Sequence, residues 1–124
     1  MLNGTLAAFR NLFNSSRTIT ANATLTAADI GKVVLVNTAG GAVTVTLPKQ
    51  SGAAGVSPTI GAGAGFVLIR SGANTLTVVS SNADTYNVGQ AFSIAVGVSN
   101  GFVIAVSQGA ASGVGDWSVL YRIA

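Results

Sequence analysis

The sequence predicts an all-β protein, a single antiparallel β-sandwich or jelly-roll-like domain with a short N-terminal arm. From Arg17 onward, apolar residues recur at a spacing of two and β-branched residues dominate, which is typical of strands. Clusters of Gly, Asn and Ser interrupt these runs roughly every ten residues, and no helical pattern lies between them. Short strands at this spacing favour sheets packed as a sandwich or jelly roll.

The clearest strand spans residues 43–47, where three apolar residues alternate with two threonines. Pro48 ends it, because proline cannot donate a hydrogen bond to a sheet. Strands are expected at residues 32–36, 43–47, 66–70, 75–80, 92–98, 102–107 and 117–123. Three of them are expected to turn one apolar face toward the core: Phe92, Ile94 and Val96, then Phe102, Ile104 and Val106, and then Trp117, Val119 and Tyr121.

Two short polar segments have the composition of hairpin turns. Residues 71–74 read Ser-Gly-Ala-Asn, and residues 99–101 end in an Asn-Gly pair, which tolerates positive φ at both positions. Residues 50–65 form a longer Gly-rich stretch that contains Pro58. A loop of this length without its own structure is usually functional or ordered by a partner, so we expect it at an interface.

The N-terminal residues follow a different pattern. Leu2, Leu6, Phe9 and Phe13 recur at spacings of four, three and four, the period of one helical face. We therefore divide the chain into an arm at residues 1–17, with the pattern of a short helix, and a β-domain at residues 18–124. The pattern fits an arm that binds a partner, and it equally fits a segment that covers one end of the domain's own core.

Composition argues against nucleic-acid and membrane partners. Six basic residues against three acidic ones give a net charge of +3, but the basic residues are scattered rather than gathered beside stacking aromatics. The longest apolar region, residues 92–106, is interrupted by Gly97, Asn100 and Gly101, so it falls short of the roughly 20 apolar residues of a membrane-spanning helix. Cysteine is absent, so no disulfide holds the fold.

The residue inventory argues against an enzyme, a metal and a cofactor. The chain has no His and no Cys, and its three acidic residues are Asp29, Asp84 and Asp116, each isolated in the sequence. Nucleophilic and acid-base catalysis need neighbouring bases or paired carboxylates. We interpret the aspartates as turn and capping residues. Residues 61–65 alternate Gly and Ala but match no phosphate-binding fingerprint.

Several segments resemble β-rich modules of tailed-phage structural proteins, which occur in tail fibres, tailspikes and capsid decoration proteins. They are Thr-Leu-Thr-Ala-Ala-Asp-Ile-Gly-Lys at residues 24–32, the run at 33–37, Ala-Val-Thr-Val-Thr-Leu-Pro at 42–48, Gly-Ala-Gly-Phe at 63–66 and Ser-Gly-Ala-Asn-Thr-Leu-Thr-Val at 71–78. The resemblance covers residues 18–107 and brings no catalytic residue with it.

Within this class, a chain of 124 residues with an apolar N-terminal stripe fits a small capsid decoration, or cement, protein. The resemblance implies a homotrimer on the capsid exterior of the virion, assembled in the host cytoplasm, with the major capsid protein as partner and no small-molecule substrate. Binding to assembled capsid alone would stabilise the head by linkage. The residues expected to contact the capsid are Leu2, Leu6, Phe9, Leu12 and Phe13.

The alternative within the same class is a tail-fibre or baseplate module that recognises host surface glycans. Such a site needs exposed aromatic residues with polar neighbours. The candidates are Trp117, Tyr121 and Tyr86, and their positions favour core and turn instead. Because one fold serves many functions, resemblance at this level does not separate the two roles.

Overall fold

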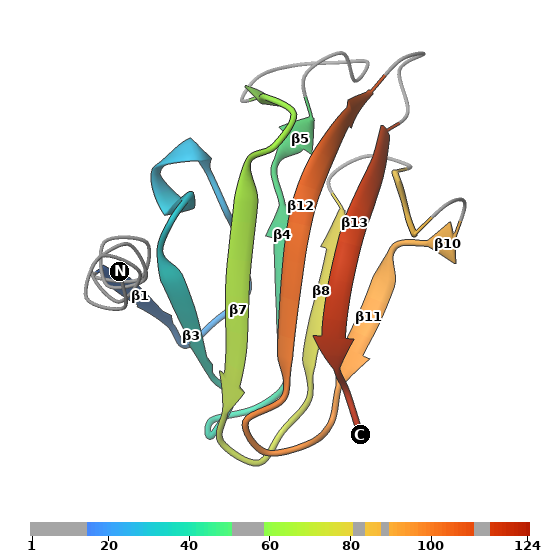
Figure 1. Ribbon diagram of the computed structural model, residues 1–124. Coiled ribbons are helices and arrows are strands. Elements are labelled where there is room, and N and C mark those ends of the chain that lie inside the picture. The colour runs from blue at the N-terminus through green and yellow to red at the C-terminus, as the bar shows by residue number, and fades with distance from the viewer. Residues whose placement is uncertain (1–14, 51–58, 81–83, 88–89, 111–114) are drawn as a thin grey trace, which may run out of the picture.

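The protein is built from two β-sheets that face each other, as the computed structural model in Figure 1 shows. The structure describes residues 15–50, 59–80, 84–87, 90–110 and 115–124. The predicted all-β, sandwich-like class is therefore confirmed. Over the described ranges, no helix has the length and apolar character needed to cross a membrane.

The larger sheet has seven strands. In spatial order they are β1 (Ser16–Ile19), β3 (Val33–Asn37), β7 (Gly65–Ser71), β12 (Phe102–Ala110), β13 (Gly115–Arg122), β9 (Thr85–Tyr86) and β10 (Gln90–Ala91). The smaller sheet runs β11 (Ser93–Val96), β8 (Leu76–Ser80), β4 (Val43–Leu47) and β2 (Ala23–Thr24). Two short strands, β5 (Lys49–Gln50) and β6 (Thr59–Ile60), form a separate pair, and a 3-10 turn, η1, spans Ala27–Asp29.

All seven strands expected from the sequence are present: β4 has the expected bounds, and the other six have shifted ends. The short strands β1, β2, β5, β6, β9 and β10 were not expected. They are two to four residues long, too short to show an alternating pattern. Because β1 begins at Ser16, the sheet starts two residues before the boundary expected at residue 18.

From β1 to β8 the chain winds alternately through the two sheets. Strands β1, β3 and β7 lie in the large sheet and pair in parallel, and β2, β4 and β8 do the same in the small sheet. Three successive turns of a flattened coil result, and β11, β12 and β13 then complete the sheets with antiparallel pairs. The expectation of purely antiparallel sheets was wrong, since both sheets are mixed. The jelly-roll expectation is not confirmed.

The two expected hairpins are instead arches between the sheets. The residues 71–74 lead from β7 in the large sheet to β8 in the small one, and residues 99–101 lead from β11 to β12 in the reverse direction. Polar turn residues mark a change of direction in either case, so composition alone does not distinguish a hairpin from an arch. Asn100 does adopt the expected positive φ, of 58°.

The first arch is locked to the turn that precedes β4. The Thr38 hydroxyl donates to the carbonyls of Asn74 at 2.7 Å and Ser71 at 3.0 Å, and the Asn74 amide donates to the Thr38 carbonyl at 2.7 Å. Gly72 has a φ of 93°, and a Cβ there would lie 2.5 Å from the Ala39 amide nitrogen. Only glycine fits this close approach.

The hydrophobic core lies between the sheets and consists of aliphatic and aromatic residues. Its buried residues are Ile19, Leu25, Val34, Val36, Val43, Val45, Leu47, Ile60, Phe66, Leu68, Leu76, Val78, Phe92, Ile94, Val96, Val103, Ala105 and Trp117. The prediction that Phe92, Ile94, Val96 and Trp117 face the core is confirmed.

The inward face predicted for β12 was the wrong one. Val103 and Ala105 are fully buried, whereas Phe102, Ile104 and Val106 are only half-buried on the other side of the strand. On β13, Val119 packs against the core but Tyr121 is 38% exposed. Residues 102–106 are apolar at every position, so periodicity alone does not show which side faces inward.

Val103 and Val106 provide a matched test of this orientation. We expect Val103→Ala to lower the free energy of unfolding by about 2 kcal/mol, because it removes two buried methyl groups and leaves a cavity. Val106→Ala removes the same atoms from the half-buried side and should cost less than about 1 kcal/mol. Urea unfolding of both variants measures the difference, and the reverse ranking would place the core on the other side of β12.

Candidate interaction surface

The outward side of the large sheet carries an apolar surface that we call the outer face. Strand register aligns its side chains in rows across β3, β7, β12 and β13. One row consists of Val33, Val67, Ile104 and Leu120, and the next consists of Leu35, Ile69, Phe102 and Arg122. We define the outer face as Val33, Leu35, Val67, Ile69, Phe102, Ile104, Val106 and Leu120.

The described strands leave the outer face open, and it is the side turned toward the viewer in Figure 1. Leu35 is 36% exposed and Leu120 is 64% exposed, while the other six residues are half-buried. Large apolar side chains clustered on one open sheet face are unusual for a monomer. They mark sites where another polypeptide or apolar surface binds.

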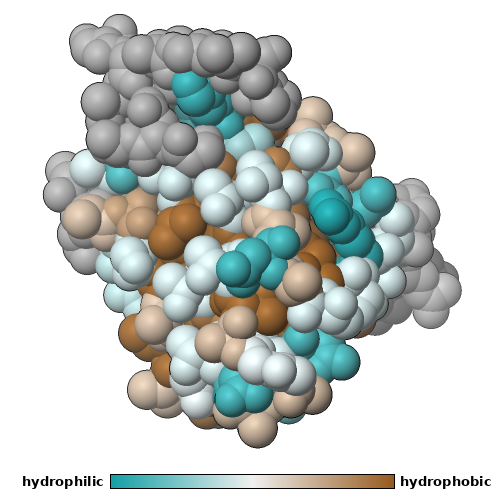
Figure 2. Space-filling model, turned by 180° about the vertical axis from the view of Figure 1, so that it is seen from behind, coloured by the Kyte–Doolittle hydropathy of each residue, from teal (hydrophilic) through white to brown (hydrophobic). Residues whose placement is uncertain are grey.

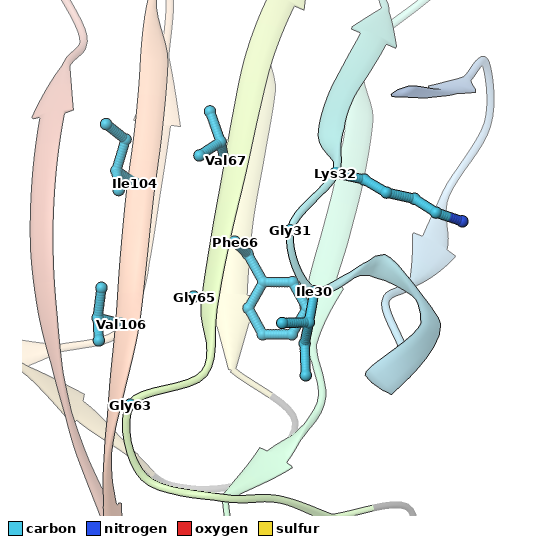
Figure 3. Close-up of a pocket in the computed structure, with 9 residues that line it drawn as sticks. All are labelled: Ile30, Gly31, Lys32, Gly63, Gly65, Phe66, Val67, Ile104 and Val106. Atoms are coloured by element: carbon cyan, nitrogen blue, oxygen red, sulfur yellow. The ribbon is translucent and has the colours of Figure 1, made fainter. Parts of the chain in front are cut away.

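A shallow groove of about 320 Å³ forms part of this surface, beside η1. Its lining residues are Ile30, Gly31, Lys32, Gly63, Gly65, Phe66, Val67, Ile104 and Val106. Figure 3 shows the Lys32 side chain extending away from Val67 and Ile104, so the walls around these two residues are apolar. Small-molecule sites usually add a few converging polar groups, which this lining does not supply. The groove suits apolar side chains of a partner.

The rim of the groove is fixed by an ion pair between the buried Asp29 and the partly exposed Arg17. Asp29 is 2% exposed, and its Oδ2 accepts from the Arg17 guanidinium at 2.8 Å and from the Thr26 amide at 3.0 Å. The Thr26 hydroxyl in turn accepts from the Ala28 amide, which completes a capping box on η1. Asp29 is thus a turn and capping residue, as the sequence predicted, and it positions the exposed Ile30.

The opposite surface of the sandwich has a different character. The small sheet points Thr24, Thr44, Thr46, Thr77, Val79, Ser93 and Ala95 outward. Figure 2 views the molecule from this side and shows it covered largely by residues of intermediate hydropathy. Threonines on an open sheet face are ordinary for a solvated surface. The two sheets therefore differ sharply on their outward sides.

The other two aspartates also make structural contacts. Asp84 is 3% exposed, and its Oδ2 accepts from the Trp117 indole at 3.2 Å and from the Gln50 amide at 3.3 Å. The Ser107 hydroxyl donates to Gln50 Oε1 at 2.7 Å, which extends this buried network. Asp116 accepts from the Thr85 hydroxyl at 2.7 Å. Within the described ranges, no three acidic residues come close enough to hold a metal ion.

The aromatic residues form a chain of edge contacts rather than an exposed platform. Trp117 is fully buried, and its ring contacts Phe66 and Phe92 at centroid distances of 6.2 Å and 6.1 Å. Tyr86 contacts Phe92 at 5.3 Å and Tyr121 at 6.2 Å. Of the three aromatics considered for glycan recognition, only Tyr121 is exposed.

The residues expected from the sequence to contact a capsid, Leu2, Leu6, Phe9, Leu12 and Phe13, lie outside the described residues. The structure adds the outer face, which sequence reasoning missed. A signal was available: residues 33–36 and 102–106 are apolar at every position rather than at alternate ones. Such continuous runs are typical of strands that are covered on both sides.

No protein-family model matches the sequence, and comparison with curated proteins finds no match. The class is therefore defined by the structure: an all-β, two-sheet domain with one apolar outer face.

The Tyr86 and Tyr121 pair predicts a loss of stability at high pH. Burial raises the pKa of Tyr86 above its ordinary value of 10.0. The charge of Tyr121 and a side-chain hydrogen bond with Tyr121 raise this pKa further. A raised pKa in the folded state means that this contribution to stability is complete below pH 10.0 and is lost as the pH rises from there through the folded-state pKa. We expect the free energy of unfolding to fall in this range, and to fall less in Tyr86→Phe.

Tyr121→Phe supplies the direct measurement. The chain has two tyrosines, so this variant leaves Tyr86 as the single phenol whose ionisation appears in the near-ultraviolet spectrum. Loss of the Tyr121 contributions should move the Tyr86 pKa back toward 10.0 without reaching it, because burial, the largest cause, remains. Ionisation of Tyr86 below pH 10.0 in the wild type would contradict the assignment.

Proposed function

We propose that the protein is a capsid decoration, or cement, protein of a tailed phage, which binds across seams between major capsid subunits on the outside of the head. The observation that carries this proposal is the outer face. Eight apolar side chains lie on the open side of a sheet that is already packed on its other side. A surface of this kind gains free energy when a second protein covers it.

The size of the outer face argues for many weak contacts rather than one strong one. Four strands spaced about 4.8 Å apart and about five residues long give a projected area of roughly 300 Å². At 25 cal/mol per Å² its burial is worth about 7 kcal/mol, and association costs of about 4 to 15 kcal/mol offset much of that. Several linked copies bind far better than one, so a homotrimer on a symmetric capsid fits this surface.

The low charge of the chain supports a packed, repeated assembly. Nine charged residues among 124 leave few ions to desolvate when surfaces come together. The resemblance to tailed-phage proteins supports the phage assignment. The resembling segments at 24–37, 42–48 and 71–78 include β2, η1, β3, β4 and part of β8, which form much of the parallel coil.

The glycan-binding alternative has less support. Trp117 is fully buried and Tyr86 is half-buried, so the exposed ring of Tyr121 is the one aromatic surface of the three considered. Stacking on sugars needs an accessible aromatic face, and Tyr121 already makes an edge contact with Tyr86.

Cosedimentation with purified phage heads that lack the protein tests the proposal. The wild type should bind saturably. Leu120→Asp places a charge on the outer face at a 64% exposed position and should weaken binding at least tenfold, because a carboxylate would be buried without a partner. Ala95→Asp introduces the same charge at an exposed position on the opposite sheet and should bind like the wild type.

Failure of the wild type to bind heads would contradict the decoration role. Binding to host cells in its place would favour the receptor-binding alternative. Equal binding by the two variants would show that the outer face is not the surface that contacts the head.

A further inference from the structure

Among the described residues, Arg70 is a buried cation that has no carboxylate partner. It is the last inward-facing residue of β7 and is 4% exposed. Its Nε donates to the Asn74 carbonyl at 2.5 Å, whereas its terminal nitrogens, Nη1 and Nη2, make no hydrogen bond or ion pair with the described residues. Buried arginines are usually paired, because removing an uncompensated charge from water is costly. An anion beside Arg70 would supply the compensation that these residues do not.

The terminal nitrogens of Arg70 reach the surface. Among the described residues, every side-chain nitrogen or oxygen that is closed off from solvent has a hydrogen-bond partner. Nη1 and Nη2 have none, so they contact solvent although the rest of the side chain is buried. The bond from Nε to Asn74 holds the guanidinium plane in place. A fixed guanidinium with two open nitrogens suits an oxyanion, because two parallel hydrogen bonds can form to two of its oxygens.

Arg70 lies at the end of the sandwich where the two arches cross between the sheets. Its backbone amide donates to the Gly101 carbonyl at 2.9 Å, so the two arches are joined there. The Asn74 carbonyl accepts from both Arg70 and the Thr38 hydroxyl. Figure 1 shows these connections together at the lower edge of the molecule. We call this region the arch end and define it as residues 38–42, 71–74 and 99–101.

The acidic residues of the chain lie at the opposite end of the sandwich. Asp116 is at the start of β13 and Arg122 is at its end, about 20 Å away at about 3.3 Å per residue. Asp84 bonds to the residue that follows Asp116, and Asp29 precedes β3, which runs toward the arch end as β13 does. The described arch end therefore has the positive charges of Arg70 and Arg122 beside it and no acidic side chain. This distribution attracts an anion.

From the buried charge, its two open nitrogens and the local excess of positive charge, we propose that the arch end binds a single oxyanion, with Arg70 at the centre of the site. Nη1 and Nη2 donate to two oxygens of one carboxylate or phosphate group. Asn74 positions the guanidinium, and Thr38 positions Asn74 through two hydrogen bonds. Because only the terminal nitrogens are open, the site recognises the charged group rather than the molecule that carries it. The inference concerns the isolated protein and does not rest on the proposed function.

NMR titration of the wild-type protein with inorganic phosphate, and separately with acetate, tests the site directly. The Nε–Hε resonance of Arg70 should move saturably. The corresponding resonance of Arg122, an exposed arginine near the same end, should move much less. Sodium chloride at the same ionic strength should move neither resonance. A response to phosphate alone identifies a phosphate site, a response to acetate alone identifies a carboxylate site, and a response to both identifies a general oxyanion site.

Two variants that lose the same charge provide a matched comparison. Arg70→Gln removes the buried guanidinium, and Arg122→Gln removes the exposed one. At about ten times the wild-type Kd, the anion should raise the Tm of the wild type and of Arg122→Gln by about 4 °C more than that of Arg70→Gln. The small rise that phosphate gives any protein remains in all three. Circular dichroism shows whether Arg70→Gln folds, and the titration of the wild type needs no variant.

Two results would overturn the proposal. One is an Arg70 resonance that moves no more than that of Arg122 in either anion. The other is an equal rise in Tm for folded Arg70→Gln and Arg122→Gln. Neither experiment uses phage heads, so failure of this proposal and failure of the decoration role would be seen in separate experiments.

Discussion

The constraint on which the structure depends is that its central strands are apolar on both sides. One side of β3, β7 and β12 packs against the small sheet through Val34, Leu68 and Val103, all fully buried. The other side carries Val33, Val67 and Ile104 in a continuous row. A two-sheet domain covers only one of these sides. The surplus apolar side is therefore built into the sequence, and burying it would take a surface from outside the two sheets.

Buried polar residues also help to hold the strands of the sandwich in position. Gln50, Asp84 and Ser107 lie inside the sandwich near Trp117, and each polar group that is described there has a hydrogen-bond partner. Unpaired, such groups would cost a few kcal/mol each, whereas a satisfied network restricts how the sheets align. This network joins β5, β12 and β13 to the segment before β9. Together with the Thr38 and Asn74 contacts at the arch, it fixes the positions of segments whose apolar residues alone would tolerate sliding.

The longer strands and the Asp29 turn could be predicted because they depend on residues close together in the sequence. The pairing of the strands and their inward sides could not, because they depend on segments far apart in the sequence. Alternation in residues 43–47 and the capping sequence around Thr26 act within a few residues, so the sequence reveals them. Whether β7 pairs in parallel with β3 depends on which sheet each connection enters, and residues 71–74 suit a hairpin as well as an arch. The inward side of β12 is decided by Val103 pairing with Leu68, which local periodicity does not encode. The outer face, by contrast, was missed although the continuous apolar runs at residues 33–36 and 102–106 are typical of strands that are apolar on both sides.

An open apolar sheet face has opposite consequences for a free chain and for a bound one. Exposed apolar side chains gathered on one face favour self-association of the free chain. The same side chains gain free energy when another surface covers them. Leu35 and Leu120 are the exposed members of the outer face, whereas its other six residues are already half-buried. Because much of the apolar area is already removed from water, the drive to self-associate is smaller than eight fully exposed side chains would give, and the two leucines contribute most to any contact made there.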